Sequence, residues 1–408
     1  MRVLVVHDRD EVRSQIKDVI LGAVPHAIIC EAVDGIRTRE KLTGTLYDFA
    51  VVDLTIPNVK GRGNVGFSVI EGILEELFAG SPMLVPSNLI GITRDADALD
   101  LVNNNIGPHL MAVLREVDGD DDWKKQLSDR TLYAENAIKS KSSALLTRYD
   151  YDALIFTALD KELSPYRDLF EISEHPQIPG LGTFFFTDLS GKPRKGACFA
   201  IGRAGQPSAA SEAQGLICQL RPKLAIMTGF CGGIPKKAEF GDILFAEMAL
   251  DWDYGKWKPN ESVSRLYARP EPISIRNSAI HRIARDIVEH GLKSESRLAA
   301  EMAILSNGEI LKPSFKLIPF ASGSAVIGDH DVLGSVKSLN ESVGGVDMES
   351  YGFYYACRYP HAAAPEFLCI KAVADDCGIE KDDRLHKVCC FASAFVAKEI
   401  MCDQWSYE

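Results

Sequence analysis

Residues 153–162 read Ala-Leu-Ile-Phe-Thr-Ala-Leu-Asp-Lys-Glu, an apolar run that becomes acidic within a few positions. The run 153–158 has the composition of a strand buried on both faces of a sheet. An acid after such a strand is costly unless it is hydrogen-bonded or functional, although a single acid there also fits helix capping. Three later segments also place small residues or acids after a buried strand: Thr228–Ile234, Gly345–Ser350 and Lys371–Asp376. Together, in this order, the four segments indicate a functional site.

Residues 151–408 predict one large α/β domain, because buried strands alternate with helical segments throughout. The predicted strands after 153–158 are Ala197–Ile201, Leu224–Thr228, Asp242–Glu247, Ala325–Ile327, Gly345–Asp347 and Phe367–Val373. The predicted helices are Ser208–Gln219, Ser278–His290, Glu349–Arg358 and His386–Met401.

Residues 1–140 predict a separate domain, with residues 141–150 as a linker. Apolar strands separated by helical segments indicate a five-stranded parallel, doubly wound sheet. The predicted strands are Arg2–Val6, Ala27–Cys30, Phe49–Asp53, Asn88–Thr93 and Leu110–Leu114.

The charge balance restricts the classes of partner. The chain of 408 residues has 45 basic and 57 acidic side chains, giving a net charge of −12. This balance argues against nonspecific binding to nucleic acid or anionic lipid, both of which need clustered Lys and Arg. No apolar run approaches the roughly 18 residues that span a bilayer, and the first residues lack the apolar core of a signal peptide. The ten cysteines are scattered without a Cys-x-x-Cys pair, which favours free thiols and a cytoplasmic protein.

Polar residues end three strands of the first domain. Asp8 follows the first strand, Asp53 ends the third and Thr93 ends the fourth. In a parallel sheet these strand ends converge on one edge. Two carboxylates there are suited to a hard divalent cation such as Mg²⁺.

Residues 1–140 resemble response-regulator receiver domains through Leu4–Asp8, Val52–Pro57 with Gly61, and Ile92–Thr93. The resemblance implies a flavodoxin-like fold in which Asp53 is the phosphoacceptor and Asp8 and Asp53 bind Mg²⁺. It also implies Thr93 as the switch hydroxyl and an upstream sensor histidine kinase or other phosphodonor as partner. Arg115 stands where a lysine usually pairs with the phosphoryl group, and His7 replaces a usual acid. The alternative is a receiver that keeps the fold without being phosphorylated.

The four segments of the second domain resemble the purine nucleoside phosphorylase superfamily, and most closely its methylthioadenosine/S-adenosylhomocysteine nucleosidases. The resemblance extends over about residues 151–405 and implies an α/β domain with a mixed central sheet. By this resemblance Asp375 protonates N7 of the departing purine and Glu162 deprotonates the attacking water. Glu349 binds the ribose hydroxyls, Met348 packs beneath the sugar, and Val332 offers backbone groups to the base.

Breaking an N-glycosidic bond builds positive charge on the ribose and negative charge on the base, so an acid and a base on opposite sides suit the reaction. Water is the expected nucleophile, because 158–162 lacks the Gly-Asp-Pro-x-Arg pattern of the phosphorylases. Phe230, before Cys231 and Gly232, also has no donor for phosphate. The glycines of 228–233 allow close backbone approach to a ligand. No cofactor is expected for this chemistry.

Basic residues predict a phosphate-bearing substrate. Arg203 lies in the glycine-containing segment 202–206 and is the first candidate for phosphate oxygens. Further candidates are Lys256, Lys258, Arg384, His386 and Lys387. For Lys256, Lys258 and Lys387 a solvated surface is an equal alternative.

A receiver fused to such a nucleosidase resembles the effectors of Detocs anti-phage systems. That resemblance implies cleavage of ATP to adenine and ribose-5′-triphosphate under phosphorelay control. Asp331 and Ala374 depart from the nucleosidase pattern. The alternatives are a methylthioadenosine/S-adenosylhomocysteine nucleosidase or a purine nucleoside phosphorylase with a structural receiver, and a non-enzymatic nucleotide sensor. A homodimer or higher homo-oligomer is expected from the family.

Overall fold

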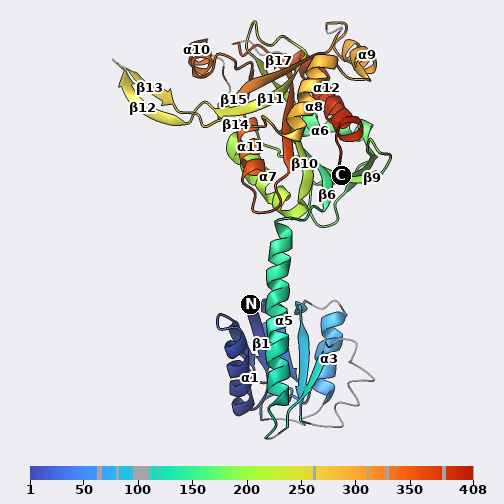
Figure 1. The fold of residues 1–408 in the computed structure, drawn as a ribbon, viewed down its shortest axis with the longest axis vertical. Coiled ribbons are helices and arrows are strands. Elements are labelled where there is room, and N and C mark those ends of the chain that lie inside the picture. Colours follow the sequence, from blue (N-terminus) through green and yellow to red (C-terminus); the bar gives the residue numbers. More distant parts are fainter. Residues whose placement is uncertain are drawn as a thin grey trace. The chain divides into compact units, whose positions relative to one another are not determined.

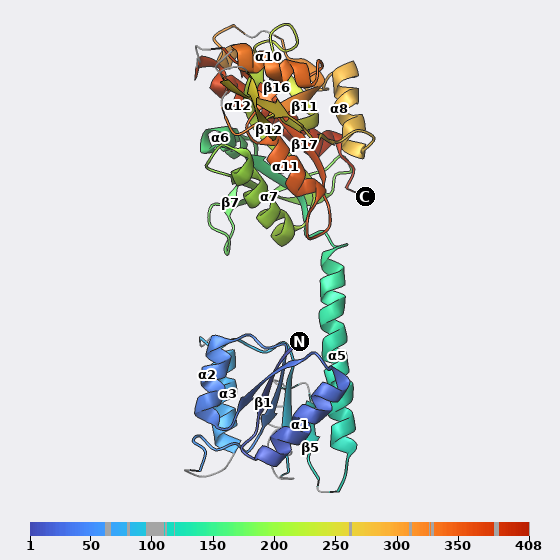
Figure 2. The same cartoon turned by 90° about the vertical axis from the view of Figure 1, so that its left-hand side faces the viewer.

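Two compact units, Met1–Ala144 and Leu145–Glu408, make up the computed structural model of this chain (Figures 1 and 2). The residues that the structure describes are 1–61, 67–79, 82–94, 110, 112–117, 119–260, 263–309, 312–325, 327, 330–378 and 383–407. In these ranges, no helix combines the length and the apolar character needed to cross a membrane.

A five-stranded parallel sheet forms the centre of the N-terminal unit, with the strand order β2-β1-β3-β4-β5. This is the flavodoxin-like order of a doubly wound sheet, so the predicted fold class is confirmed. The strands are β1 (Arg2–Val6), β2 (Ile28–Ala32), β3 (Phe49–Asp53), β4 (Leu89–Thr93) and β5 (Ala112–Arg115). The helices are α1 (Asp10–Ala23), α2 (Gly35–Gly44), α3 (Phe67–Phe78) and α5 (Asp122–Leu145).

The side chains of β1 alternate between the two faces of the sheet and contribute to both apolar layers of this unit. Val3 and Val5 pack with buried residues of α1 and α5, whereas Leu4 and Val6 pack with buried residues of α2 and α3. Successive side chains of a strand point to opposite faces, so a run of apolar residues is buried only when helices cover both faces.

A ten-stranded mixed sheet forms the centre of the C-terminal unit, and its longest strand, β10, pairs in parallel with β6 and β17. The mixed sheet confirms the predicted class of this unit. Its strands are β6 (Tyr151–Thr157), β7 (Ser173–Glu174), β8 (Gly182–Thr187), β9 (Pro193–Ala200), β10 (Pro222–Gly233), β11 (Asp242–Asp251), β14 (Ile273–Ser274), β15 (Ser314–Ser322), β16 (Gly345–Asp347) and β17 (Glu366–Asp375). The helices are α6 (Asp160–Leu169), α7 (Gln206–Leu220), α8 (Ala279–His290), α9 (Glu295–Leu305), α10 (His330–Leu339), α11 (Ser350–Arg358) and α12 (His386–Glu399).

A hairpin of β12 (Gly255–Asn260) and β13 (Val263–Ala268) forms a separate two-stranded sheet (Figure 1). The predicted strand Ala325–Ile327 is wrong, because the strand in this region is β15 and Ala325 and Ile327 lie beyond its end. The short apolar triplet suggested a strand, whereas β15 is partly exposed and contains Pro319, which weakens its strand signal.

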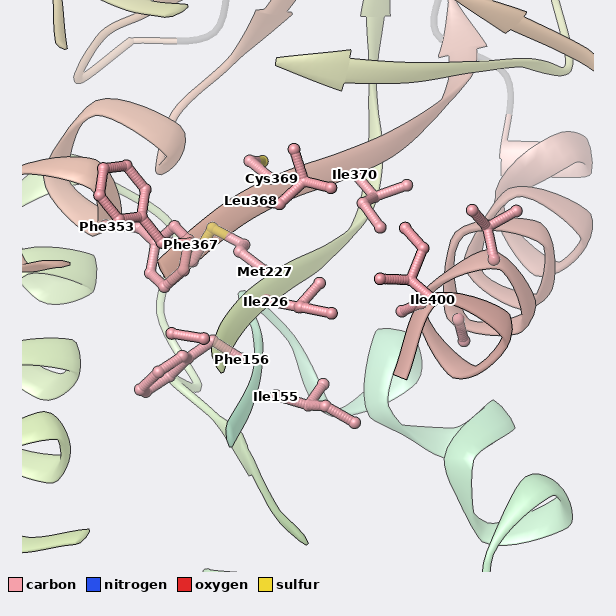
Figure 3. Close-up of a cluster of buried hydrophobic side chains, with 14 of the residues drawn as sticks. Ile155, Phe156, Ile226, Met227, Phe353, Phe367, Leu368, Cys369, Ile370 and Ile400 are labelled. Atoms are coloured by element: carbon pink, nitrogen blue, oxygen red, sulfur yellow. The ribbon is translucent and has the colours of Figure 1, made fainter. Parts of the chain in front are cut away.

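The core of the C-terminal unit lies on both faces of β6, β10 and β17. Figure 3 shows Phe156 and Met227 on the side of Phe353 in α11, and Ile155 and Ile226 on the opposite side. The rings of Phe156 and Phe353 have centroids 5.6 Å apart. This two-sided burial holds the three parallel strands in register, so their carboxyl ends lie at one edge.

Candidate active site

One cavity at the carboxyl edge of β6, β10 and β17 brings together most of the predicted site residues. Glu162 reaches it from the first turn of α6, Asp375 from the end of β17, and Glu349 from the residue before α11. The cavity is also lined by the predicted residues Phe230, Cys231, Gly232 and Met348. The three carboxylates therefore share one site, as a two-sided acid–base mechanism needs.

Glu162 is held by backbone groups from two elements. Its side chain is 2% exposed. Oε2 accepts a hydrogen bond from the Leu159 N–H at 2.9 Å, and Oε1 accepts one from the Phe230 N–H at 3.2 Å. Burial raises the pKa of Glu162, while attraction to Lys371 and the two N–H groups acts in the opposite direction.

Gly229 creates the space for this carboxylate. Its φ of +146° lies in a region that favours glycine. A Cβ at this position would collide with Oε1 of Glu162 and would lie 3.1 Å from Nζ of Lys371. The strand can therefore pass directly beside the carboxylate, which lets the next N–H group bond to it.

Lys371 is a buried cation between two of the carboxylates. Its side chain is fully buried in β17, with Nζ 3.9 Å from Oε1 of Glu162 and 3.5 Å from Oε2 of Glu349. Burial alone would lower the pKa of Lys371, but attraction to Glu162 and Glu349 outweighs it and raises this pKa well above its usual range. Lys371 was not among the predicted site residues, although a lysine inside a buried strand is itself a signal of a paired charge.

Glu349 lies on the opposite side of Lys371 and is also buried. Its Oε1 accepts a hydrogen bond from the Gly205 N–H at 3.1 Å. The neighbouring Asp347 also lines the cavity, and its carboxylate accepts bonds from the N–H and hydroxyl of Ser350. Burial, opposed by Lys371, raises the pKa of Asp347 to about 6.

Asp375 lies where β10 and β17 lose their regular pairing. The register shifts between Cys231 and Gly232, and Gly232 pairs with Asp375. Oδ1 of Asp375 accepts a hydrogen bond from the Cys377 N–H at 2.9 Å, and a Cβ on Gly232 would lie 3.0 Å from this oxygen. The pKa of the Cys231 thiol is raised well above its usual range by burial, so this thiol is neutral.

Two basic residues, Lys161 and His386, lie on the Phe230 side of the cavity. The Phe230 ring stacks on His386 with centroids 4.1 Å apart. Nζ of Lys161 is 4.8 Å from the Phe230 centroid and 3.0 Å from Nδ1 of His386. His386 was among the predicted basic residues, whereas Lys161 was not. Lys161 stands in the same helical turn as Glu162.

Two predicted substrate residues do not line this cavity. Val332 lines a neighbouring cavity with Trp252 and Trp257, and Arg203 has an exposed side chain. Gly328 and Asp329, which precede Val332, lie outside the described residues, as does the side chain of Asp331. Among the other basic candidates, Arg384 pairs with Glu309 at 3.1 Å, and Lys256, Lys258 and Lys387 are exposed.

A second polar cluster lies at the carboxyl edge of the N-terminal sheet and contains Asp8, Asp53 and Thr93. Asp53 is 4% exposed and its Oδ1 accepts hydrogen bonds from the N–H and hydroxyl of Thr55. Burial raises the pKa of Asp53, while the nearby His7 acts to lower it.

Arg115, which was predicted for this pocket, ends β5 and pairs with Thr93 of β4. Its side chain is exposed, and the next residue, Glu116, is buried with Oε2 3.7 Å from Nε2 of His7. Because side chains alternate along an extended chain, the residue after Arg115 faces inward. The pocket therefore contains a buried carboxylate, Glu116, that was not predicted.

An α/β fold with a carboxylate-lined cavity at its strand ends is typical of proteins that bind small ligands at that edge of the sheet. The chain belongs to the phosphorylase superfamily, whose family model matches residues 152–398.

Two relatives and one solved structure illustrate the similarity. The chain is 25% identical to uncharacterized protein y4jS of Sinorhizobium fredii (strain NBRC 101917 / NGR234), over 97% of this chain and 98% of that protein. It is 22% identical to ATP nucleosidase Cap17 of Escherichia coli (strain KTE188), over 67% of this chain and 55% of that protein, so it spans about half of Cap17. S-adenosylhomocysteine nucleosidase of Streptococcus pyogenes is 15% identical with a TM-score of 0.45, over 62% of this chain and 96% of that one.

Replacing Lys371 by Met is expected to lower the free energy of unfolding of the C-terminal unit by about 3–5 kcal/mol, because two buried carboxylates lose their shared cation. Urea unfolding followed by tryptophan fluorescence measures the change. The exposed Lys256, replaced by Met in the same way, is the control and should change stability by less than about 0.5 kcal/mol. Equal effects of the two substitutions would contradict a structural role for the buried charge.

Proposed function

We propose that the C-terminal unit hydrolyses the N-glycosidic bond of a purine nucleotide. The observation that carries this proposal is the single cavity lined by Glu162, Glu349 and Asp375, with Lys371 between the first two. Glu162 has the fixed orientation of a base, and Glu349 accepts the hydrogen bonds of ribose hydroxyls. Asp375 is the acid that protonates N7 of the departing purine.

Glu162 and Asp375 carry out the two proton transfers of the proposed reaction. The oxygen of water bonds to C1′ of the ribose and a proton of that water moves to Glu162. The bond between C1′ and the purine nitrogen breaks, and its electrons pass to the base as Asp375 donates a proton to N7. The attraction of Lys371 opposes the rise that burial causes in the pKa of Glu162, which favours the ionised form of the base.

Water rather than phosphate is the proposed nucleophile. The residues found to line the cavity, within the described ranges, include no Lys or Arg. Phe230 presents a ring to the cavity and not a hydroxyl donor.

We propose ATP as the substrate, giving adenine and ribose-5′-triphosphate. Support comes from the alignment with ATP nucleosidase Cap17 and from the Lys161–His386 pair beside Phe230. Arg203 lies two residues before Gly205, whose N–H bonds to Glu349, and is the proposed partner of the phosphate oxygens. A methylthioadenosine/S-adenosylhomocysteine nucleosidase is the second candidate, favoured by the apolar residues Ala325, Ile327 and Val346 in the cavity wall.

The N-terminal unit is proposed to regulate this activity as a receiver-like module in an anti-phage response. The flavodoxin-like strand order and the buried Asp53 beside Thr93 at the strand ends support this role. Phosphorylation of Asp53 by an upstream sensor kinase is the proposed input.

Incubation of the full chain with ATP, ADP, AMP, adenosine and methylthioadenosine is expected to release adenine fastest from ATP, measured by chromatography of the free base. Glu162→Gln and Asp375→Asn should each lower the rate at least about 100-fold, because each removes a proton-transfer group. The exposed neighbours provide matched controls, Asp160→Asn and Asp376→Asn, which should retain activity. Adenine from methylthioadenosine alone would refute ATP, and tight binding without release would refute hydrolysis.

The acid limb of the pH profile of kcat/KM is expected above the pKa of about 4.3 of an ordinary glutamate. The base must be ionised, and burial raises the pKa of Glu162. Activity is therefore lost as the pH falls through this raised value. An acid limb at or below pH 4 would contradict Glu162 as the base.

Addition of acetyl phosphate is expected to change adenine release by the wild-type chain and to leave the Asp53→Ala variant unchanged. A difference between the two would show that Asp53 receives the phosphoryl group. The exposed Asp18, replaced by Ala, is the control and should respond as the wild type. Identical behaviour of wild type and Asp53→Ala would indicate a structural N-terminal unit.

A further inference from the structure

His7 places an imidazole among the carboxylates of the N-terminal pocket. Its Nδ1 is 3.3 Å from Oδ1 of Asp8 and 3.7 Å from Oδ2 of Asp53. One ligand atom from each of these three residues lies within 4.8 Å of the other two. The side chains of His7 and Asp53 are each 6% exposed and that of Asp8 is 31% exposed, so the cluster is open to solvent on one side.

This donor set does not fit Mg²⁺ well. Mg²⁺ takes oxygen ligands in a near-ideal octahedron, and imidazole nitrogen is a poor ligand for it. Imidazole with carboxylates suits divalent transition metals such as Zn²⁺, Co²⁺ and Fe²⁺. His7 stands where a receiver-like pocket was expected to have an acid, so the pocket differs from a magnesium site in the residue that decides the metal.

Glu116 provides a second, independent observation. It is 5% exposed, and its two carboxylate oxygens have different surroundings. Oε1 pairs with Arg94 at 2.5 Å and lies 3.8 Å from Arg9. Oε2 is buried, has no hydrogen-bond partner among the residues that the structure describes, and faces Nε2 of His7 at 3.7 Å.

The two sides of the His7 ring therefore have different neighbours. Nδ1 accepts a hydrogen bond from the Arg9 N–H at 3.1 Å and faces Asp8 and Asp53, whereas Nε2 faces Glu116. A histidine that binds a metal commonly donates its other N–H to a carboxylate, which fixes the ring and strengthens the ligand.

We propose that His7, Asp8 and Asp53 bind a divalent transition metal of the Zn²⁺ class, with Glu116 as the carboxylate that orients His7. The metal takes Nδ1 of His7 and one oxygen from each aspartate, and the Arg9 N–H gives up its bond to Nδ1. The solvent-exposed side at Asp8 leaves a coordination position for water or for an anionic oxygen. The inference does not depend on the activity of the C-terminal unit.

Titration of the metal-free full chain with Co²⁺ tests the proposal, because a bound Co²⁺ in a site of low coordination number gives visible absorption bands. We expect these bands to appear, Zn²⁺ to displace Co²⁺, and Mg²⁺ in large excess not to do so. His7→Ala should abolish the bands. Glu116→Gln should weaken Co²⁺ binding about 10- to 100-fold, as expected for loss of a carboxylate that orients a metal-bound histidine.

His26→Ala is the matched control, because His26 is 65% exposed and pairs with Glu135. It should leave the Co²⁺ bands unchanged. His7→Asp keeps a metal ligand at this position and is expected to bind Mg²⁺ in place of Co²⁺, which separates loss of the imidazole from loss of the fold. Co²⁺ binding that is equal in the wild type and His7→Ala, or Mg²⁺ that displaces Co²⁺ at similar concentration, would overturn the proposal.

Discussion

The buried ammonium group of Lys371 offsets the negative charge of two buried carboxylates in the C-terminal cavity. Glu162 and Glu349 are both nearly inaccessible to solvent, and two such carboxylates cannot remain charged in a protein interior without compensation. Lys371 lies between them and carries the opposite charge. One side chain thus places its positive charge beside a buried carboxylate on either side of it.

Topology brings these groups together. The parallel pairing of β6, β10 and β17 places their carboxyl ends at one edge, and each acid follows or ends a strand. Glycine in β10 then allows the backbone to pass close to Glu162, because a side chain at Gly229 would occupy the space of the carboxylate. The fold supplies the proximity of the groups, and the small residues supply the room for them.

The sequence predicted the fold class of both units and the carboxylates that share the cavity, because buried apolar strands ending in acids are strong local signals. It did not predict the buried Glu116, because one residue of register decides which side chain faces inward. Arg115 and Glu116 are adjacent, and strand alternation sends only one of them inward. Lys371 lies within a predicted strand, but its role as a shared cation was not predicted, because its partners Glu162 and Glu349 are distant in the sequence. The roles given to these residues remain predictions.

The pairing of β16 has a mechanical consequence. Gly232 and Gly233 at the end of β10 pair with Val346 and Gly345 of β16, and Met348 and Glu349 follow directly. The cavity wall formed by the end of β10 is therefore hydrogen-bonded to the strand that leads into Met348 and Glu349 on the other side. A displacement of the end of β10 therefore also moves Met348 and Glu349.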